Sequence, residues 1–352
     1  MKIEKIEYIH VESKRKEPFV IATGSSNVAH NIIVKLYAGE YCGIGNACPN
    51  SVTKETRDTV LMALNIFSDE LVEEDASNID AINMKMDSIL EKNPSAKAGI
   101  DLALYDLHGK VKDLPVYELL GQKKEKMLTD MTIGIMSKED AVEHALHYKD
   151  QGFRALKIKI GLDKIKDVEV VKSVRETVGD DIIIRVDANQ GYDVKTAIEV
   201  LKKIEPYRIE QVEQPVKWDD LKGLGEVRRN SPIPITADEA VKTKEDAHKI
   251  IENDCADKIN IKLMKCGGLT KALEINKIAE DNGMETMIGC MSENRVSITA
   301  GLHFTLSQKN VRYADLDSHF SLINDRTRGG FVFEDGFLVP LNKPGFGVDA
   351  QL

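Results

Sequence analysis

The chain has 352 residues, of which 42% are hydrophobic and 30% are charged. This balance is typical of a soluble globular protein, and the length allows one large domain with a smaller one. The formal net charge of -10 provides no basic field for a phosphate backbone, so we expect no nucleic-acid partner. The N-terminus alternates charged and apolar residues and fits neither a signal peptide nor a membrane anchor, which predicts a cytoplasmic protein without a membrane partner.

The first part of the chain, residues 1–125, is predicted to form a small α+β unit. Apolar residues alternate with polar ones over residues 1–40, as in antiparallel strands. Residues 53–120 instead follow the spacing of amphipathic helices, and Gly121 comes where the last of these helices is expected to end. We therefore expect strands followed by helices here.

Residues 126–317 show a repeat in which short β-type runs alternate with helical stretches. The runs recur roughly every 25 residues, which is the spacing of βα units. They are MTIGI (131–135), ALKIKI (155–160), IIIRVDA (182–188), RIEQVEQ (208–214), IPITADE (233–239), KINIKL (258–263), ETMIGC (285–290) and VRYADLD (311–317). Eight such units predict a (β/α)₈ barrel of the TIM type. The Gly- and Pro-rich tail, residues 318–352, is expected to return and pack on the N-terminal unit.

Several strands of this barrel carry polar residues on the face that points inward. Side chains alternate along a strand, so Lys157 and Lys159 share the face that is opposite to the apolar residues of their run. The same rule pairs Arg185 with Asp187, Gln211 with Glu213, Thr236 with Asp238, and Asn260 with Lys262. Burying unpaired charges costs several kcal/mol. A purely structural network is one explanation, and an active site at the carboxyl ends of the strands is the explanation we favour.

Three carboxylates, those of Asp187, Glu213 and Asp238, come near the ends of the third, fourth and fifth strands. Such an arc offers oxygen ligands to a hard cation, and the lack of a nearby His or Cys argues against zinc or non-haem iron. We expect Mg²⁺, with Mn²⁺ as an alternative. Asn189 and Glu239 are close enough to support the ligands, although each also fits an ordinary loop hydrogen bond.

Lys159 ends the second strand and Lys265 follows the sixth, so a closed ring of eight places them on opposite sides. A substrate held at the carboxylates would have one amine on each face of its reacting carbon, which suits removal of a proton from one face and its return to the other. A lysine base needs a lowered pKa, and positive charge from Lys157 near Lys159 and from Lys262 near Lys265 would favour this.

These motifs together resemble the muconate-lactonizing branch of the enolase superfamily. The motifs are K-x-K at 157–159, D-A-N-Q at 187–190, E-Q-P at 213–215, A-D-E at 237–239 and K-C-G-G at 265–268. The resemblance covers essentially the whole chain and implies a modified, enolase-like barrel with a capping domain built from the N-terminal region and the C-terminal tail. It also implies that the three carboxylates bind Mg²⁺, which holds the substrate carboxylate and stabilises an enediolate.

Asp315 and Asp317 favour one reaction of this branch. Their spacing puts both carboxylates on one face at the end of the eighth strand, where they would suit an ammonium group at the far end of the substrate. A dipeptide has such a group, and this D-x-D resembles the pattern of dipeptide epimerases. The loop after Pro18-Phe19 lacks the arginine that meets the glutamate side chain in Ala-Glu epimerases, so a neutral, apolar or cationic C-terminal residue is open.

We therefore expect a dipeptide epimerase that inverts the Cα of the C-terminal residue by 1,1-proton transfer between two lysines. We expect Thr23 and Ser25 of the 19–28 loop, Ser292 and Glu293 after the seventh strand, and Lys157 to bind the substrate together with Asp315 and Asp317. The branch also contains N-acylamino acid racemases, o-succinylbenzoate synthases and cycloisomerases, and the last two need only one lysine as a base. A non-catalytic binding protein with this fold would be expected to have lost a ligand or a lysine. The small-molecule substrate is the expected partner, and the enzyme is expected to form a homo-oligomer.

Overall fold

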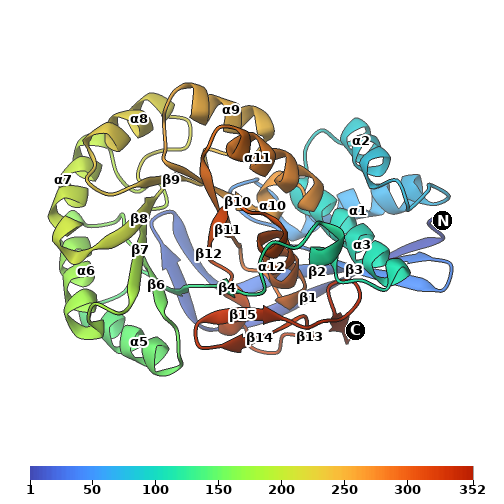
Figure 1. Cartoon of the computed structure of the whole chain (residues 1–352), viewed down its shortest axis with the longest axis horizontal. Helices are drawn as coiled ribbons and strands as arrows, with labels where there is room; N and C mark the ends of the chain where they lie inside the picture. The colour runs from blue at the N-terminus through green and yellow to red at the C-terminus, as the bar shows by residue number, and fades with distance from the viewer. Residues whose placement is uncertain (352) are drawn as a thin grey trace.

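A computed structural model describes residues 1–351 and shows an N-terminal α+β unit beside a curled parallel sheet surrounded by helices (Figure 1). The N-terminal sheet is antiparallel, with the order β1 (Lys5–Ile21), β2 (Gly24–Ala38) and β3 (Tyr41–Ala47). The predicted alternation is confirmed, since Ile32, Val34 and Leu36 of β2 are all fully buried on this sheet. Strands β1 and β2 form a long hairpin that reaches from this unit to the barrel (Figure 1).

Four helices of the N-terminal unit follow the sheet: α1 (Arg57–Leu71), α2 (Ile79–Ile89), α3 (Pro94–Lys112) and α4 (Val116–Leu119). Helix α3 packs very closely on β3, because two glycines of β3 remove the side chains between them. A Cβ atom on Gly45 would lie 2.0 Å from the carbonyl oxygen of Gly99, and one on Gly43 would lie 2.0 Å from that of Ala103. These glycines therefore permit the contact that buries most of α3.

The predicted eight parallel strands form one sheet in chain order. They are β5 (Met131–Ile133), β6 (Ala155–Lys159), β7 (Ile183–Asp187), β8 (Ile209–Glu213), β9 (Ile235–Ala237), β10 (Lys258–Lys262), β11 (Glu285–Gly289) and β12 (Val311–Ala314). The intervening helices are α5 (Lys138–Asp150), α6 (Lys164–Val178), α7 (Val194–Ile204) with η1 (Glu205–Tyr207), α8 (Leu221–Asn230), α9 (Lys244–Glu252), α10 (Leu263–Cys266), α11 (Leu269–Asp281) and α12 (Arg295–Ser307). The fold is the expected enolase-like barrel. Between β12 and β5, where the ring closes, isolated contacts replace a regular ladder. One of them is the 3.3 Å hydrogen bond from the Asp130 amide to the Ala314 carbonyl.

After β12 the chain departs from the βα repeat. It continues through η2 (Ser318–Ser321), β13 (Thr327–Gly329), β14 (Phe331–Glu334), β15 (Phe337–Pro340) and β16 (Val348–Ala350). Strand β15 pairs with β4 (Met127–Leu128) beside the barrel. The tail also reaches the N-terminal unit, since the Phe346 amide donates to Asp106 Oδ1 of α3 at 2.7 Å. On these contacts we propose the division into residues 1–125, 126–317 and 318–352.

Two hydrophobic cores stabilise the chain, one between the N-terminal sheet and helices α1 to α3, and one through the barrel and its surrounding helices. Within residues 1–351, no helix combines the length and the apolar character needed to cross a membrane. The barrel core keeps its strands in register, so the residues at their carboxyl ends lie at one level.

Candidate active site at the mouth of the barrel

Three buried carboxylates lie side by side at the carboxyl ends of β7, β8 and β9. Asp187 and Glu213 are the last residues of β7 and β8 and are partners in the strand register, and Asp238 follows β9. All three have 1% exposure or less. Because they come from consecutive strands, their oxygens form the arc that the sequence predicts.

Two lysines inside the barrel balance part of this negative charge. Lys157 Nζ lies 2.8 Å from Glu213 Oε2, 2.8 Å from Asp315 Oδ2 and 3.0 Å from Asp187 Oδ2. Lys262 Nζ lies 2.8 Å from Asp238 Oδ2. Burial lowers the pKa of Lys157, but the surrounding carboxylates outweigh it and hold that pKa well above its usual value. Lys157 therefore remains a cation beneath the cavity, which is not the substrate-facing position that we expected for it.

The other two lysines contact opposite ends of the carboxylate arc. Lys159 Nζ, at the end of β6, lies 2.6 Å from Asp187 Oδ2. Lys265 Nζ, on α10 after β10, lies 2.6 Å from Asp238 Oδ1 and donates to the Asn260 carbonyl at 3.0 Å. In the order of the strands around the ring, the arc therefore has one amine on each flank.

The turn that carries Lys265 depends on two glycines. Gly267 and Gly268 end α10 with φ values of +107° and +112°, which favour glycine. A Cβ atom on Gly268 would also lie 2.4 Å from Asp101 Oδ2 of α3. Asp101 in turn accepts hydrogen bonds from Thr270 at the start of α11, at 2.6 Å from its hydroxyl. The close approach of α3 and α11 thus fixes the position of the short helix with Lys265.

The carboxylate arc has the chemistry of a divalent-cation site. Burial, and after it the negative charge of Asp187, raise the pKa of Glu213 to about 8. Burial also opposes ionisation of Asp238, but the amines of Lys262 and Lys265 hold its pKa well below the usual range. Carboxylate oxygens alone, without sulfur or imidazole, suit Mg²⁺ or Mn²⁺. The residues therefore fit the expected ion.

Asn189 and Glu239 lie beside the arc, as expected. The Asn189 amide donates to Asp187 Oδ1 at 2.8 Å, and its side chain donates to Glu239 Oε1 at 3.3 Å. Two oxygen atoms here, Asn189 Oδ1 and Glu239 Oε2, are buried and have no hydrogen-bond partner among residues 1–351. Burial and nearby Asp238 raise the pKa of Glu239 to about 7. These residues offer further oxygen atoms at the edge of the cavity.

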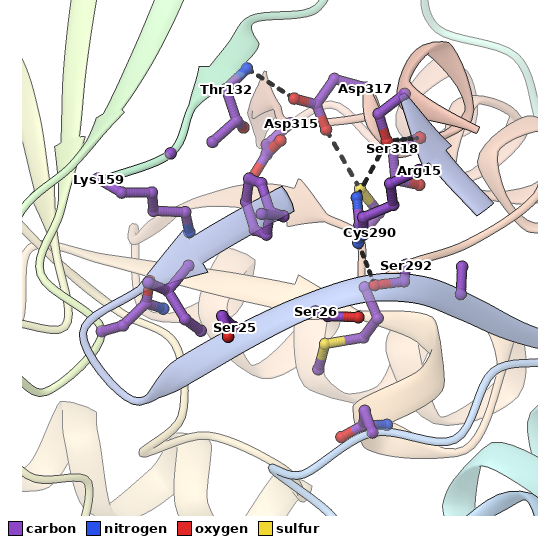
Figure 2. Close-up of a pocket in the computed structure, with 18 of the residues that line it drawn as sticks. Arg15, Ser25, Ser26, Thr132, Lys159, Cys290, Ser292, Asp315, Asp317 and Ser318 are labelled. Carbon is purple, nitrogen blue, oxygen red and sulfur yellow. Dashed lines mark hydrogen bonds between the residues drawn. The ribbon is translucent and has the colours of Figure 1, made fainter. Parts of the chain in front are cut away.

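A second acidic pair lies on another side of the cavity, just after β12. Asp317 Oδ2 accepts from the Thr132 amide at 2.7 Å, and Oδ1 accepts from the Cys290 thiol at 3.7 Å (Figure 2). Burial and the charge of Asp315 raise the pKa of Asp317 to about 6. Within residues 1–351, Asp315 Oδ1 is buried without a partner. The oxygens of the two acids and Cys290 Sγ lie within 4.8 Å of one another, so a single ammonium group could reach both acids.

A cavity of about 1060 Å³ connects these groups and lies beneath the β1–β2 hairpin. Of the residues predicted from the sequence, ten line it: Thr23, Ser25, Lys159, Asn189, Asp238, Glu239, Lys262, Ser292, Asp315 and Asp317. Figure 2 shows Lys159 on one side of this space and Asp317 on another, with Ser25 on the hairpin. Asp187, Glu213, Lys157 and Lys265 are buried next to these residues.

The structure does not bring Glu293 to the cavity wall, contrary to the expectation from the sequence. Its side chain is 2% exposed, and Oε1 accepts from the Met291 amide at 2.6 Å. Its own amide donates to Ser318 Oγ at 3.0 Å. Glu293 therefore holds the loop after β11 against η2, and of the two residues predicted in this loop only Ser292 lines the cavity.

Three further residues belong to this site, of which the strand alternation placed only Asn260 inward and without a role. Asn260 Nδ2 donates to Glu213 Oε1 at 2.9 Å, so it orients a carboxylate of the arc. The ring of Trp218, the only tryptophan, lies 4.1 Å from Lys242 Nζ at the cavity edge. Arg15 of β1 also lines the cavity, and no motif in the sequence marks it.

Two family models match this sequence. The model described as mandelate racemase / muconate lactonizing enzyme, N-terminal domain, matches residues 4–121. The model described as enolase C-terminal domain-like matches residues 140–351. The chain belongs to the enolase superfamily.

Similar proteins within the superfamily are epimerases. A relative from Enterococcus faecalis, named hydrophobic dipeptide epimerase, is 40% identical to this chain. The match covers 98% of this chain and 99% of the relative. An L-Ala-D/L-Glu epimerase from Clostridium acetobutylicum is 37% identical, with 97% and 96% covered. The crystal structure of the Enterococcus faecalis V583 dipeptide epimerase with Mg and L-Leu-L-Tyr matches with a TM-score of 0.96 at 39% identity, covering 99% of both chains. These relatives place the chain among isomerases that act on amino acid derivatives.

Proposed function

We propose that this protein is a Mg²⁺-dependent dipeptide epimerase that inverts the Cα of the C-terminal residue. The observation that supports this proposal most strongly is the position of Lys159 and Lys265, whose amines contact opposite ends of one carboxylate arc. A carbon held next to the arc would have an amine on either face. This is the arrangement that inversion requires, because the proton must leave one face and return to the other.

Each group has a defined task in this proposal. Asp187, Glu213 and Asp238 would hold Mg²⁺, which when bound would fix the substrate carboxylate and stabilise the negative charge that develops there. Lys159 and Lys265 exchange roles as base and acid, depending on which epimer is bound. We propose that Mn²⁺ can replace Mg²⁺ and that the enzyme is a homo-oligomer.

The acidic pair sets the other end of the substrate. Asp315 and Asp317 line the cavity just after β12, four strands from β8 around the ring, and both offer acceptors for an N-terminal ammonium. A dipeptide has its C-terminal carboxylate and its N-terminal ammonium separated by one peptide unit and two Cα atoms. We infer that the carboxylate arc and the acidic pair, carried by different strands of the ring, together select this class of substrate.

Isotope exchange in D₂O tests the proposal. A dipeptide library incubated with the protein and Mg²⁺ should gain deuterium at the Cα of the C-terminal residue, with a second diastereomer appearing in the NMR spectrum. Absence of exchange with every dipeptide would reject the proposal. A one-base reaction of a cycloisomerase or o-succinylbenzoate synthase would instead be indicated if Lys265→Ala kept turnover of such a substrate while Lys159→Ala abolished it.

A further inference from the structure

The guanidinium of Arg15 is held by neutral groups inside the cavity. Its Nη1 donates to Ser321 Oγ at 3.0 Å, and Nη2 donates to Ser292 Oγ (Figure 2). Its Nε is buried and has no hydrogen-bond partner among residues 1–351. No Asp or Glu of these residues lies within 4.0 Å of the guanidinium, so this cation has no direct counter-ion in the protein.

Arg15 lies in an irregular part of β1. The pairing of β1 with β2 shifts between Lys14 and Phe19, which is the effect of a β-bulge on an otherwise regular ladder. The Arg15 guanidinium then stacks on the Phe19 ring at 4.9 Å, and Lys159 Nζ lies 6.0 Å from the centre of the same ring. The Phe19 ring is thus within contact distance of both the proposed base and Arg15, so the two cations border the same part of the cavity.

Positive and negative side chains lie close together on this side of the cavity. Burial lowers the pKa of Arg15, whereas the charge of Asp317 opposes this effect, and Arg15 remains a cation because an arginine is not deprotonated in proteins. Figure 2 shows Arg15 on the same side of the cavity as Asp317 and Ser318. A substrate with only an ammonium here would be attracted by Asp315 and Asp317 but would leave Arg15 unpaired. A substrate that also carries a carboxylate would satisfy both.

We propose that Arg15, together with Ser292 and Ser321, binds a carboxylate on the N-terminal half of the substrate. Since this inference rests on the proposed function, the substrates it specifies are dipeptides that begin with Asp or Glu. An N-succinyl amino acid presents a carboxylate on the same half of the molecule, without the ammonium. Acidic dipeptides and N-succinyl amino acids would both present a carboxylate to Arg15. Only the dipeptides have an ammonium group that needs Asp315 and Asp317.

Arg15 also joins β1 to the barrel. A test must therefore separate a role in binding the substrate carboxylate from a role in holding β1 in place. The Ile323 amide donates to the Lys14 carbonyl at 2.8 Å, and Arg15 forms a backbone bridge with Leu322. If Arg15 acted only as a brace, its removal would lower activity with every substrate to the same extent. If it binds a carboxylate, the loss would be confined to substrates that carry one.

The experiment compares kcat/KM for Glu-X and Asp-X with Gln-X and Asn-X, where X is the same C-terminal residue in all four. The wild-type protein should favour the acidic members by about 30-fold, the factor typical of a buried charged hydrogen bond. Arg15→Met should remove this preference through KM and leave Gln-X within about 3-fold, and Arg15→Lys should restore part of it. Lys14→Met is the matched control, because Lys14 is an exposed neighbour that does not line the cavity.

Equal turnover of Glu-X and Gln-X by the wild-type protein would overturn the inference, as would an equal loss with both in Arg15→Met. A melting temperature of Arg15→Met close to that of Lys14→Met checks that the fold is kept. If no dipeptide exchanges in D₂O, the proposed function itself has failed. Exchange of N-succinyl but not N-acetyl amino acids, lost in Arg15→Met, would then still support the carboxylate site, whereas exchange of neither would reject it.

Discussion

The buried charges of the site compensate one another residue by residue. Lys157 contacts three carboxylates, and Asp238 accepts from both Lys262 and Lys265. Leaving one such charge without its partners would cost several kcal/mol, so each lysine contributes to folding as well as to the proposed chemistry. Substitutions that keep the shape of a side chain are therefore the informative ones.

Replacing either flanking lysine should separate exchange from inversion. In Lys159→Met, epimerisation should fall by about 10²- to 10⁴-fold, the usual contribution of a general base. The remaining Lys265 should still exchange the Cα proton of one epimer with D₂O, since it can return a deuteron to the same face. Lys265→Met should show the opposite preference, measured by NMR on each pure epimer. Loss of exchange with the same epimer in both variants would contradict opposed bases.

Mg²⁺ should stabilise the folded protein through the carboxylate arc. At a concentration of 100 times Kd, a ligand that binds only the native state adds about 2.7 kcal/mol to the free energy of unfolding. Glu213→Gln keeps the side-chain shape but removes a ligand charge, so this gain should shrink. Urea unfolding with Mg²⁺ and with EDTA measures it, and Glu199→Gln, at a surface ion pair with Lys164, is the control. An equal gain in both variants would place the ion elsewhere.

For single residues, alternation along the strands was enough to predict the inward direction of Lys159, Asp187 and Glu213, because each lies at the end of a regular strand. It was insufficient for Arg15, which follows a break in the ladder, and for Glu293, which lies in a loop. The direction of these two side chains depends on contacts with residues far away in the chain.

At the scale of the elements, the turns that follow the strands bring the site together. Asn189 and Gln214 adopt positive φ values of 39° and 35° directly beyond β7 and β8, a costly conformation for residues other than glycine. Gln214 Oε1 accepts from the Asp238 amide at 2.9 Å, and its Nε2 donates to the Val216 carbonyl at 3.0 Å. This side chain thus ties the ends of β8 and β9, which explains the glutamine of the E-Q-P motif. Composition alone does not predict such a tie.

The glycine turn after α10 should tolerate no side chain. Gly268→Ala combines backbone strain, about 1 to 3 kcal/mol, with a clash against Asp101, and it should displace Lys265. We expect an unfolding free energy lower by at least about 3 kcal/mol and a lower kcat. Gly283→Ala is the control, because Gly283 has a φ of +69° but open space around its Cβ position, so it should cost only about 1 kcal/mol. Similar losses in the two variants would contradict the clash.

On the scale of the whole molecule, α12 joins the barrel to the N-terminal unit and the tail. Every residue from Val296 to Ser307 is buried. His303 of this helix packs edge-on against Tyr117 of α4 at 4.9 Å and near Phe346 of the tail at 5.3 Å. Neither ring nitrogen of His303 has a hydrogen-bond partner among residues 1–351, and burial lowers its pKa to about 3. The junction therefore contains a histidine that stays neutral in the folded protein.

This histidine should make the fold sensitive to acid. Its folded pKa lies below the unfolded value of about 6.5, so its contribution is complete above pH 6.5 and is lost as the pH falls toward 3. Between pH 7 and pH 5 the loss should be about 2 kcal/mol. His303→Phe should remove that loss, whereas His248→Phe, on the exposed side of α9, should keep it. Urea unfolding at both pH values tests this, and identical pH dependence in the two variants would refute it.

The barrel was predictable as a whole because its eight runs recur at one period, and a period specifies neighbours in a ring. The departures lie where the repeat ends. Residues after β12 form η2 and short strands, and the edge between β12 and β5 is joined by isolated contacts that depend on the packing of β4 and the tail. Such long-range packing leaves no periodic trace in the sequence.

The two walls of the cavity, the β1–β2 hairpin and the carboxyl ends of the barrel strands, come from separate parts of the chain. Arg15, Phe19, Thr23 and Ser25 all belong to one hairpin near the N-terminus, while the lysines and acids stand on barrel strands more than a hundred residues later. Under the proposed function, the groups that bind the N-terminal half of the substrate are divided between this continuous hairpin and the barrel loops that carry Ser292, Asp315 and Asp317. Exchanging the hairpin segment should therefore change the substrate preference while the proposed bases and metal ligands on the barrel strands stay in place.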